Sequence, residues 1–316
     1  MAPGYSEIIK VLGKHRVKLN EPLAKHTTFQ IGGPADLFVE IEKETELIKL
    51  IKLVRVLDLP YFILGNGSKL LVADEGFRGI VIKIQNSKFS TSLKLRGASK
   101  IQDYTIIVDA GVSVPDLLEK LATEGYTGLE FLAGIPGTVG GVVRGNAGAW
   151  LQQIGDKVNR VKILDDNNQI VWLSNKSCHF EYRQSRFKKT KEIILAVELE
   201  LKKSDPKKIK AQIDEYLKQR QGQPKEPSVG SIFVNPKPKA AAELIEACGL
   251  KGKIIGKAKV SEKHANFIVN LGGAKASEVV KLIKLIKEKV KEKFGVELKE
   301  EVVYLGFGEV KIWQSL

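Results

Sequence analysis

The sequence predicts an α+β fold in three consecutive lobes, which we place at residues 1–82, 83–203 and 204–316. The chain of 316 residues is too long for one ordinary small domain, and its hydrophobic fraction of 43% is typical of a globular protein. Runs with strand-like alternation and runs with helical spacing follow one another along the chain, without an internal repeat. These observations favour several lobes that each contain helices and sheets.

The first lobe is predicted to contain strands around one helix. Leu37–Ile41 alternates as a strand does, and Glu44–Leu57 carries apolar residues at helical spacing. Tyr61–Leu64 is a short apolar run followed by the glycine turn Gly65–Ser68, which indicates a strand that leads into a tight turn. Gly79–Ile84 is predicted as a further strand.

The second lobe is predicted to be rich in strands and to contain one clear helix. This helix is expected to begin after Ser113 as its N-cap, with Pro115 in the first turn, and to end at Gly125. The predicted strands are Thr105–Ala110, Val158–Leu164, Ile170–Leu173 and Glu192–Leu201.

The third lobe is expected to begin with a helix at Ser204-Asp205-Pro206. A polar stretch at Gln219–Ser228, rich in Gln, Pro and Gly, follows this helix. The remaining predicted elements are a helix at Ala240–Cys248, a strand at Asn266–Asn270, a long amphipathic helix at Ala276–Phe294 and a strand at Glu301–Leu305.

The apolar runs are too short for a membrane protein. None approaches the roughly 20 residues that a membrane-spanning helix needs. The segment Met1–Val17 alternates charged and apolar residues and lacks the continuous apolar stretch of a signal peptide. We therefore expect a cytoplasmic protein that does not associate with membranes.

Cysteine and histidine are scarce and do not occur at metal-ligand spacings. The two cysteines are far apart, and none of the four histidines forms an HExxH or similar pattern. The sequence therefore predicts free thiols and no metal site. The residues concerned are Cys178, Cys248, His15, His26, His179 and His264.

The formal net charge of +14 is compatible with nucleic acid, a membrane surface or an anionic small substrate. Much of the excess lies in mixed Lys/Glu helices such as Lys281–Lys293, where lysines face away from an apolar stripe. No basic stretch is interleaved with aromatic residues in the way that base stacking requires. These features favour a solvated basic surface over a nucleic-acid site.

Two glycine-rich segments indicate a cradle for a bound dinucleotide. The first is the turn Gly65–Ser68, which by itself is equally compatible with a plain hairpin turn. The second, Gly134–Gly148, contains glycines so densely that backbone N–H groups can approach an anion, and we expect neither helix nor strand there. Its interspersed apolar residues favour an ordered segment. Neither segment fits the GxGxxG or GxxxxGK[ST] patterns, which argues against the usual nicotinamide and ATP folds.

The two segments belong to a longer series of motifs that resembles the UDP-N-acetylenolpyruvoylglucosamine reductase family. The series covers nearly the whole chain, in order and at suitable spacing, and the combination is highly specific. It comprises Thr27–Ala35 (TTFQIGGPA), Leu64–Ser68, Gly128–Ala149, Tyr182–Phe187 (YRQSRF), Gly230–Pro236 (GSIFVNP), His264–Ile268 and Glu301-Val302. The short interval between Arg183 and Ser231 resembles the family's shorter, second type.

The resemblance implies an FAD enzyme of peptidoglycan precursor synthesis. Two α+β lobes of the vanillyl-alcohol-oxidase type would hold FAD without a covalent bond, and a C-terminal α+β domain would bind the substrate. The implied reaction reduces the enolpyruvyl ether of UDP-N-acetylglucosamine to UDP-N-acetylmuramate, after NADPH has reduced the flavin and left the same site. The implied partners are the UDP-sugar and NADPH, and we expect a monomer.

The resemblance also assigns three catalytic residues. Arg183 matches the family's arginine that stabilises the enolate formed by hydride addition, and Glu301 matches the glutamate that acts with it. Ser231 matches the serine that donates a proton to the adjacent carbon. Without this context Arg183 and Glu301 would be assigned to the solvated surface, and Ser231 to a turn.

The remaining site residues follow from the same motifs. Those expected to bind the cofactor are Gly65, Asn66, Gly67, Ser68, Lys69, Leu70, Gly134, Ile135, Pro136, Gly137, Thr138, Gly140, Gly141, Asn146 and Gly148. Those expected near the substrate are Tyr182, Asn235, His264 and Asn266, with a purely structural role equally open for His264.

Three positions depart from the family's pattern. Lys69 stands where an asparagine usually follows the Gly-Asn-Gly-Ser turn, and we expect it to add charge near the pyrophosphate. Val303 stands where an arginine usually follows the last Glu-Val, and Gly256-Lys257-Ala258 replaces Gly-Gly-Ala. These departures affect the details of pyrophosphate and substrate binding rather than the reaction.

Two other functions stay open at the level of sequence. An FAD oxidase of a small alcohol or sugar could share the fold, and His26 is the nearest candidate for a covalent flavin bond. A basic nucleotide- or nucleic-acid-binding module without catalysis would be colourless, and its affinity for polyanions would fall steeply with salt.

Overall fold

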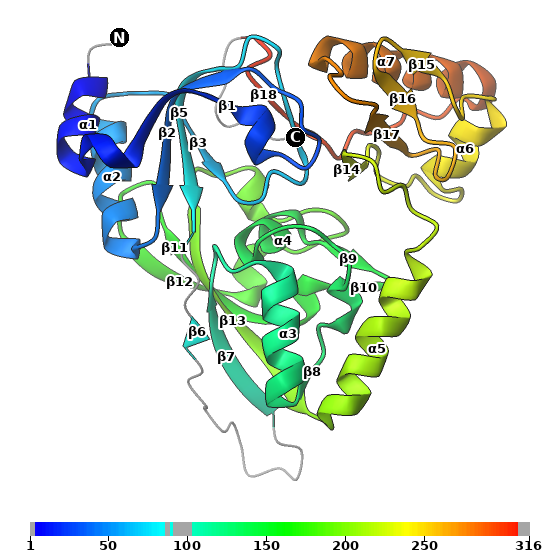
Figure 1. The fold of residues 1–316 in the computed structure, drawn as a ribbon. Helices are drawn as coiled ribbons and strands as arrows, with labels where there is room; N and C mark the ends of the chain where they lie inside the picture. Colours follow the sequence, from blue (N-terminus) through cyan, green and yellow to red (C-terminus); the bar gives the residue numbers. More distant parts are fainter. Residues whose placement is uncertain (1–3, 86–88, 91–102, 309–316) are drawn as a thin grey trace.

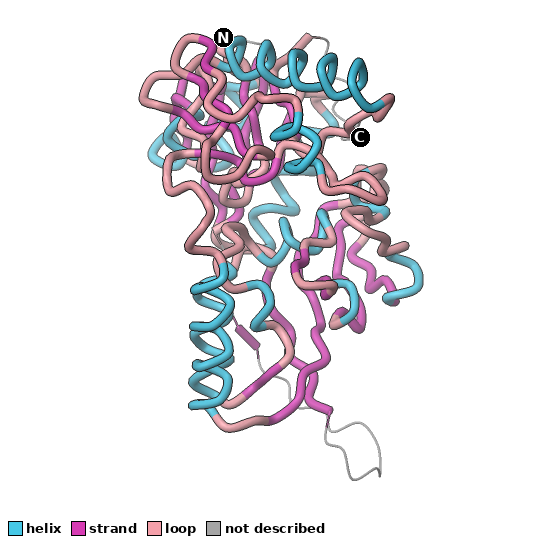
Figure 2. Tube along the Cα trace, turned by 90° about the vertical axis from the view of Figure 1, so that its right-hand side faces the viewer, coloured by secondary structure: helices cyan, strands magenta, loops and turns pink. Residues whose placement is uncertain are grey.

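The computed structural model describes residues 4–85, 89–90 and 103–308. The first and second lobes lie one above the other in Figure 1, and the C-terminal domain lies beside the first lobe. In the view turned by 90°, the long helix α7 (Ala276–Phe294) crosses the top and α5 (Pro206–Gln219) runs down below it (Figure 2). The three parts therefore surround a common centre.

The first lobe is a four-stranded sheet with the order β1-β2-β5-β3, in which only the β1–β2 pair is antiparallel. Apolar side chains of β2 and of α2 are fully buried against each other in one core. The elements of this lobe are α1 (Tyr5–Leu12), β1 (Val17–Pro22), β2 (Pro34–Ile41), α2 (Glu44–Val56), β3 (Tyr61–Leu64), β4 (Leu70–Val72) and β5 (Phe77–Ile84).

The second lobe is an antiparallel sheet with the order β12-β11-β13-β7-β6. Helices α3 and α4 pack on it, and α5, which the predicted boundary places in the third lobe, packs against α3. Its elements are β6 (Phe89–Ser90), β7 (Asp103–Asp109), α3 (Val114–Glu124), β8 (Tyr126–Thr127), α4 (Val139–Gly145), β9 (Gly148–Ala149), β10 (Gln152–Gln153), β11 (Val158–Leu164), β12 (Ile170–Ser174) and β13 (Ile193–Lys203).

The C-terminal domain is an antiparallel sheet, β14-β17-β16-β15, packed against α6 and α7. Its elements are β14 (Ser228–Ser231), α6 (Ala241–Ala247), β15 (Ile254–Ile255), β16 (Ala258–Val260), β17 (Phe267–Asn270) and α7, followed by β18 (Val303–Leu305). Short 3₁₀ helices elsewhere in the chain are Lys14–Arg16, Leu23–His26, Glu130–Leu132, Ile154–Asp156, Asn175–Cys178 and Arg186–Lys188.

The strongly patterned elements confirm the sequence predictions. Tyr61–Leu64, Val158–Leu164 and Ala276–Phe294 have the predicted bounds. The hydroxyl of Ser113 caps α3 by accepting a hydrogen bond from Asp116 N at 3.2 Å, and Gly125 ends that helix in the left-handed conformation, at φ 72°. No helix in the described part of the chain is long and apolar enough to cross a membrane.

One prediction about the second glycine-rich segment was wrong. Residues Val139–Gly145 form a helix, α4, although we expected no helix there. Thr138 caps it, and three valines, Val139, Val142 and Val143, bury its inner face. A Cβ on Gly140 would lie 2.9 Å from the Cβ of Ala110, so glycine allows the helix to lie directly on the end of β7. Tertiary packing therefore outweighs the low helix propensity of glycine.

The C-terminal strand β18 returns to the first lobe and pairs in parallel with β4. Ala73 N donates to Leu305 O at 2.8 Å, and Val303 N donates to Lys69 O at 2.8 Å. Gly306 then passes so close to the first lobe that a Cβ on it would lie 2.0 Å from Gly76 O. This pairing fixes the C-terminal segment beside the loop that precedes β4.

Replacement Gly306→Ala should destabilise the protein by about 2 kcal/mol or more, because its φ of 85° disfavours a side chain and the methyl group meets a backbone oxygen. Urea unfolding followed by circular dichroism measures this loss. Gly222→Ala is the control, since nothing lies within 4 Å of its added Cβ. Equal stability of the two variants would contradict the close approach.

The segment Ser231–Phe233 is held by the buried side chain of Asn266. Asn266 Oδ1 accepts from Phe233 N at 2.9 Å, and Asn266 Nδ2 donates to Phe233 O at 2.8 Å. Ile232 N donates to the backbone carbonyl of Asn266 at 2.8 Å. The Asn266 side chain therefore forms hydrogen bonds with both the N–H and the C=O of Phe233, which is buried.

Asn266→Ala should cost about 2 to 4 kcal/mol of unfolding free energy, because two buried backbone groups of Phe233 lose their partners. Asn235→Ala should cost less, since the exposed Asn235 accepts only from Ala241 N and water can replace it. Chemical denaturation of both variants tests this order. A smaller loss for Asn266→Ala than for Asn235→Ala would show that the double hydrogen bond does not hold the segment.

Candidate active site

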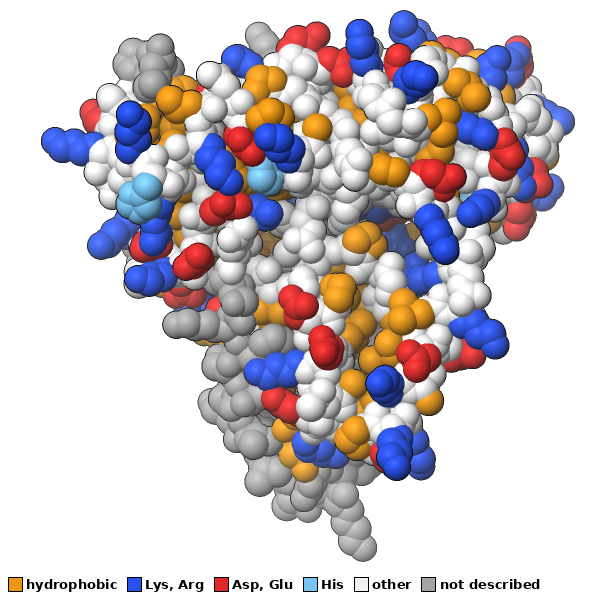
Figure 3. Space-filling view, in the orientation of Figure 1, with side chains coloured by type: hydrophobic (Ala, Val, Ile, Leu, Met, Phe, Trp, Pro, Cys, Tyr) orange, Lys and Arg blue, Asp and Glu red, His pale blue; other side chains and the backbone are white. Residues whose placement is uncertain are grey.

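A large cleft opens where the three parts of the fold meet. Its volume is about 1180 Å³, which exceeds the roughly 300–1000 Å³ of a typical small-molecule site. The lining comes from both glycine-rich segments, from β14 and from the residues around β18. Figure 3 shows this hollow between the C-terminal domain and the second lobe, with Lys and Arg side chains inside it. The cleft therefore has room for more than one ligand.

The two glycine-rich segments face each other across one end of the cleft. Asn66 Nδ2 donates to Gly137 O at 3.2 Å, and a Cβ on Gly65 would lie 2.6 Å from Thr138 Oγ1. The first segment is not a hairpin turn, because β3 pairs with β5 whereas β4 pairs with β18. Gly67 has a φ of 61°, and a side chain there would collide with His26 O. Glycine is therefore required for this approach of backbones.

Almost all of the residues predicted to bind the cofactor line this cleft, the exception being Asn146. Asn146 is fully buried, with its side chain occupied by the protein. Its Nδ2 donates to Gln153 Oε1 and Glu181 O, and its Oδ1 accepts from Gly155 N. The structure therefore places Asn146 under α4, where it joins three segments behind the cleft.

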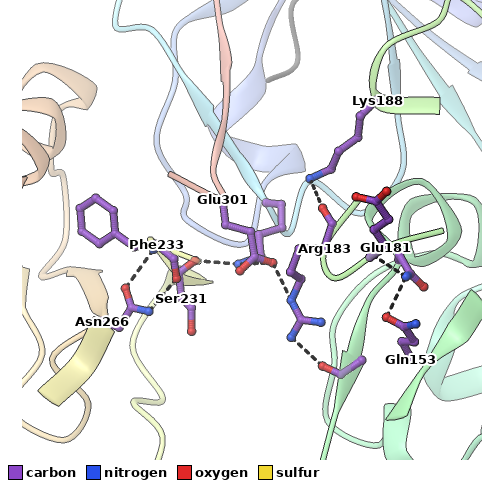
Figure 4. Close-up of polar contacts among 11 residues, drawn as sticks. Gln153, Glu181, Arg183, Lys188, Ser231, Phe233, Asn266 and Glu301 are labelled. Carbon is purple, nitrogen blue, oxygen red and sulfur yellow. Dashed lines mark hydrogen bonds and ion pairs between the residues drawn. The ribbon is translucent and has the colours of Figure 1, made fainter. Parts of the chain in front are cut away.

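The three residues predicted as catalytic come together on the cleft wall. Arg183 Nε lies 3.4 Å from Glu301 Oε1, and Arg183 Nη2 donates to Gly148 O at 2.7 Å. Figure 4 shows Glu301 between Arg183 on one side and Ser231 on the other. The arginine comes from the second lobe, whereas the serine and the glutamate come from the C-terminal segment, so the array exists only in the assembled fold.

Arg183 is held in an unfavourable backbone conformation. It adopts a φ of 57° in a tight turn in which Glu181 and Gln184 pair through their backbones. Lys188 Nζ donates to the Arg183 carbonyl at 2.8 Å. A non-glycine residue with positive φ costs free energy and is often found at functional sites. The turn directs the guanidinium toward Glu301.

Ser231 ends β14 at an irregularity in the sheet. The register of β14 on β17 shifts between Ser228 and Ser231, and Gly230 adopts a φ of 71°. Such a bulge redirects the side chain that follows it. Glu301 N donates to Ile232 O at 2.7 Å, which ties the serine segment to the glutamate segment.

Lys69 lies in the middle of this array. Its Nζ donates to Ser231 O at 2.7 Å and is 3.3 Å from Glu301 Oε1. Burial lowers the pKa of the Lys69 ammonium, while the neighbouring Glu301 opposes this effect. The structure thus places Lys69 among the predicted catalytic residues rather than alone beside the glycine turn.

The cleft is rich in cations. Burial lowers the pKa of Arg144 to about 10 and also lowers the pKa of Lys188, and Arg220 is lowered by burial and by Arg183. The basic side chains on the lining are Lys69, Arg144, Arg183, Lys188, Lys191 and Arg220, and the acidic ones are Glu192 and Glu301. Gathering positive charge in this way costs free energy unless an anion binds, so the cleft suits a negatively charged ligand.

Two of the four residues predicted near the substrate line the cleft, namely Tyr182 and Asn235. Tyr182 is exposed, and the guanidinium of Arg183 lies 5.1 Å from its ring centre. His264 and Asn266 are not among the lining residues. The His264 ring packs on Phe267, and burial lowers the pKa of His264. Asn266 accepts a hydrogen bond from Phe233 N and so supports the segment that carries Ser231.

Sequence reasoning missed several residues of the cleft. Arg144 lies within the second glycine-rich segment, and Lys188 follows Arg183 closely, so both could have been found by proximity to the motifs. Trp150 comes shortly after the last glycine and packs against Tyr216 with the rings tilted and their centres 4.4 Å apart. Arg220 lies over Trp150 at 4.7 Å, but it comes from a polar stretch that carried no functional signal.

The lining fits FAD without a covalent bond. The facing glycine loops offer a side-chain-free approach to backbone N–H groups, and the cations beside them suit a pyrophosphate. Among residues 4–85, 89–90 and 103–308, no histidine or cysteine lines the cleft. Within the same residues no three or more His, Cys, Asp or Glu side chains come together as a metal site.

Comparisons with known proteins agree with this geometry. Residues 35–174 match the model of an FAD binding domain, and residues 223–305 match the C-terminal domain of UDP-N-acetylenolpyruvoylglucosamine reductase. The reductase of Caldanaerobacter subterraneus subsp. tengcongensis is 42% identical over 94% of this chain and 96% of its own length. That of Anoxybacillus flavithermus is 43% identical over 92% and 94%.

A solved structure supports the same relationship. The crystal structure of UDP-N-acetylenolpyruvylglucosamine reductase from Thermus caldophilus is 34% identical and superimposes with a TM-score of 0.74. The match covers 92% of this chain and 98% of that one. With an FAD-binding region, a matching C-terminal domain and close relatives along almost its whole length, the chain belongs to the UDP-N-acetylenolpyruvoylglucosamine reductase family.

Proposed function

We propose that this protein is an FAD-dependent oxidoreductase that uses NADPH to reduce the enolpyruvyl ether of UDP-N-acetylglucosamine to UDP-N-acetylmuramate, in peptidoglycan precursor synthesis. The observation that carries the proposal is the array of Arg183, Glu301 and Ser231 on the wall of a cleft that also contains both glycine loops. The relatives support it, since they are named as this reductase.

The glycine loops Gly65–Ser68 and Gly134–Gly141 would hold FAD along one end of the cleft. When bound, FAD takes a hydride from NADPH and supplies it to the vinyl carbon of the substrate. The chain itself orients the two reactants and excludes water, and the excess of cations attracts the diphosphate and the carboxylate of the UDP-sugar.

Arg183 is placed to stabilise the charge that develops on the substrate. Hydride addition leaves negative charge on the carbon next to the carboxylate, in the form of an enolate. Arg183 has one N–H directed at Glu301 and another at the Gly148 carbonyl, so its guanidinium is held before the substrate arrives. A preorganised cation of this kind stabilises charge without reorganisation during the reaction. Glu301 keeps the guanidinium in place from the opposite lobe.

Ser231 would donate the proton that completes the reduction. Its place at the end of β14 brings it within the same array as Glu301 and Arg183, as Figure 4 shows. A serine hydroxyl is a weak acid, so its proton must be replaced from its polar surroundings or from water. The substrate carbon that accepts the proton is the one on which the charge stabilised by Arg183 develops.

The alternative function, an FAD oxidase of a small alcohol or sugar, has less support, and so has a covalent bond to the flavin. His26, the nearest candidate for that bond, is engaged with Glu21 at 3.0 Å and stacks on Phe38, with ring centres 4.0 Å apart. It is not among the lining residues of the cleft. A monomeric state and a cytoplasmic location stay predictions from the sequence.

The proposed function is tested by adding NADPH to the purified yellow protein, with and without the enolpyruvyl sugar nucleotide. Turnover that requires this nucleotide, with formation of UDP-N-acetylmuramate, is the expected result. Reoxidation of the flavin by oxygen at a rate that ignores the nucleotide would contradict the proposal and favour an oxidase.

Ser231→Ala should leave the reduction of FAD by NADPH unchanged and slow the transfer to the sugar nucleotide by about 100-fold or more, because only the second step needs the proton. Stopped-flow absorbance of the flavin separates the two steps. Ser6→Ala is the control, since this serine is exposed on α1 and is not among the lining residues of the cleft. Equal slowing of both steps by Ser231→Ala would indicate that Ser231 only supports the fold.

A further inference from the structure

Three chain segments meet at one point beside the cleft, and Lys69 links all of them. The segments are the end of the first glycine loop, the end of β14 and the residues that precede β18. Glu301 N donates to Ile232 O, and Val303 N donates to Lys69 O. The ammonium of Lys69 then joins the carbonyl of Ser231 to the carboxylate of Glu301. Its contacts are therefore with the residue proposed as proton donor and with the carboxylate that holds Arg183.

We propose that Lys69 is a positioning residue for the step that reduces the sugar nucleotide, because its ammonium fixes Ser231 through the serine carbonyl and Glu301 through the carboxylate. This inference rests on the proposed function. It differs from the role expected from the sequence, in which Lys69 adds charge near the cofactor's pyrophosphate. The structure assigns the lysine to the chemistry of the substrate instead.

Geometry supports this assignment. The contacts of Lys69 Nζ are 2.7 Å to Ser231 O and 3.3 Å to Glu301 Oε1, so two directions of the ammonium are already occupied by protein. The parallel register of β4 and β18 sets Leu70 opposite Val303, which places the residues preceding both strands beside each other. The pairing of β4 with β18 therefore places the backbone of Lys69 beside Glu301, and the two contacts hold its ammonium.

Lys69 provides one of the two positive charges that hold the Glu301 carboxylate. Glu301 Oε1 is shared by two cations, Lys69 Nζ at 3.3 Å and Arg183 Nε at 3.4 Å. Arg183 approaches from the second lobe and Lys69 from the first. The carboxylate is thus held between the two lobes, and Arg183 remains beside it to face the substrate. Loss of Lys69 would leave Glu301 with Arg183 alone and would release the Ser231 carbonyl.

An uncharged donor such as asparagine could also donate to the Ser231 carbonyl, but it carries no charge for the glutamate. A lysine therefore adds an ion pair to the array in this chain. Methionine resembles lysine in length and removes the charge, whereas arginine keeps the charge. These two replacements separate packing from electrostatics.

The test measures FAD affinity of the apoprotein and both half-reactions for Lys69→Met and Lys69→Arg. For Lys69→Met we expect unchanged FAD affinity, unchanged reduction by NADPH, and a loss of about 100-fold in the transfer to the enolpyruvyl sugar nucleotide, as for removal of one preorganised donor. Lys69→Arg should recover part of that loss. Thermal unfolding should be the same in both variants.

Lys289→Met is the matched control. Lys289 also pairs with a glutamate, Glu292, at 2.7 Å, but this pair is exposed on α7. Exposed pairs contribute little, so the control should equal the wild type in every measurement.

The pH dependence gives a readout that a merely structural residue would not change. The groups that face Lys69 are Glu301 before β18, Arg183 in its turn and Lys188 in the following 3₁₀ helix. Burial lowers the pKa of Lys69 below its ordinary 10.5. The ammonium is present below this pKa and is lost above it, so the wild-type transfer step should slow as the pH rises, at a pH below 10.5. Lys69→Arg should shift this fall to higher pH, and Lys69→Met should lack it.

Three results would overturn the inference. FAD binding at least tenfold weaker in Lys69→Met would indicate that the lysine binds the pyrophosphate of the cofactor. An unchanged transfer step would show that the two contacts have no role in it, and equal slowing of both half-reactions would indicate a general distortion. If the proposed function itself were wrong, the wild-type protein would not transfer electrons to the sugar nucleotide. This outcome is distinct from the three results above, which concern the Lys69 variants.

Discussion

The parallel pairing of β18 with β4 is the constraint on which the site depends. It attaches the end of the C-terminal domain to the first lobe and sets Val303 opposite Leu70. The chain then brings Glu301 to the loop after β3, and Glu301 N in turn holds Ile232 and the serine beside it. The C-terminal domain also contacts the first lobe elsewhere, since Thr28 donates to Ser228 O and Asp74 accepts from Ala276 N, but the β18–β4 pairing is what brings Glu301 to Lys69. The array of Arg183, Glu301 and Ser231 is therefore a consequence of how the domains pack on each other.

Without a ligand, the resulting cleft carries more positive than negative side chains. Arg144, Lys188 and Arg220 are all cations whose pKa values are lowered by burial, and few carboxylates face them. A folded protein tolerates such an arrangement when a bound anion restores the balance, and a UDP-sugar carries both a diphosphate and a carboxylate. The same charges make the site selective for anionic ligands. Glu301 is an exception because it organises cations rather than repelling the ligand.

Glycine has two separate uses in this molecule. In the loops that face the cleft it leaves the backbone accessible, as at Gly137. Elsewhere it allows segments to pack without intervening side chains, as where Gly140 meets Ala110 and where Gly306 meets Gly76. The second use explains why a segment of low helix propensity forms α4. A ligand site and its support are therefore built from the same residue type for different physical reasons.

The sequence alone determined the elements whose signals are local. Periodicity fixed α7 and β11, and the cap at Ser113 with glycine at Gly125 fixed both ends of α3. The motifs also predicted Arg183, Ser231 and Glu301 as a group, and the structure brings these residues together on the cleft wall. Only the tertiary structure decided what those residues touch. Lys69 and Ser231 are 162 residues apart, and no local pattern reports a contact that depends on the docking of β18 on β4. Packing between distant segments also explains why Val139–Gly145 forms the helix α4, because this packing outweighs local propensity. It likewise explains why the buried Asn146 hydrogen-bonds other parts of the protein, such as Gly155 N, and does not line the cleft.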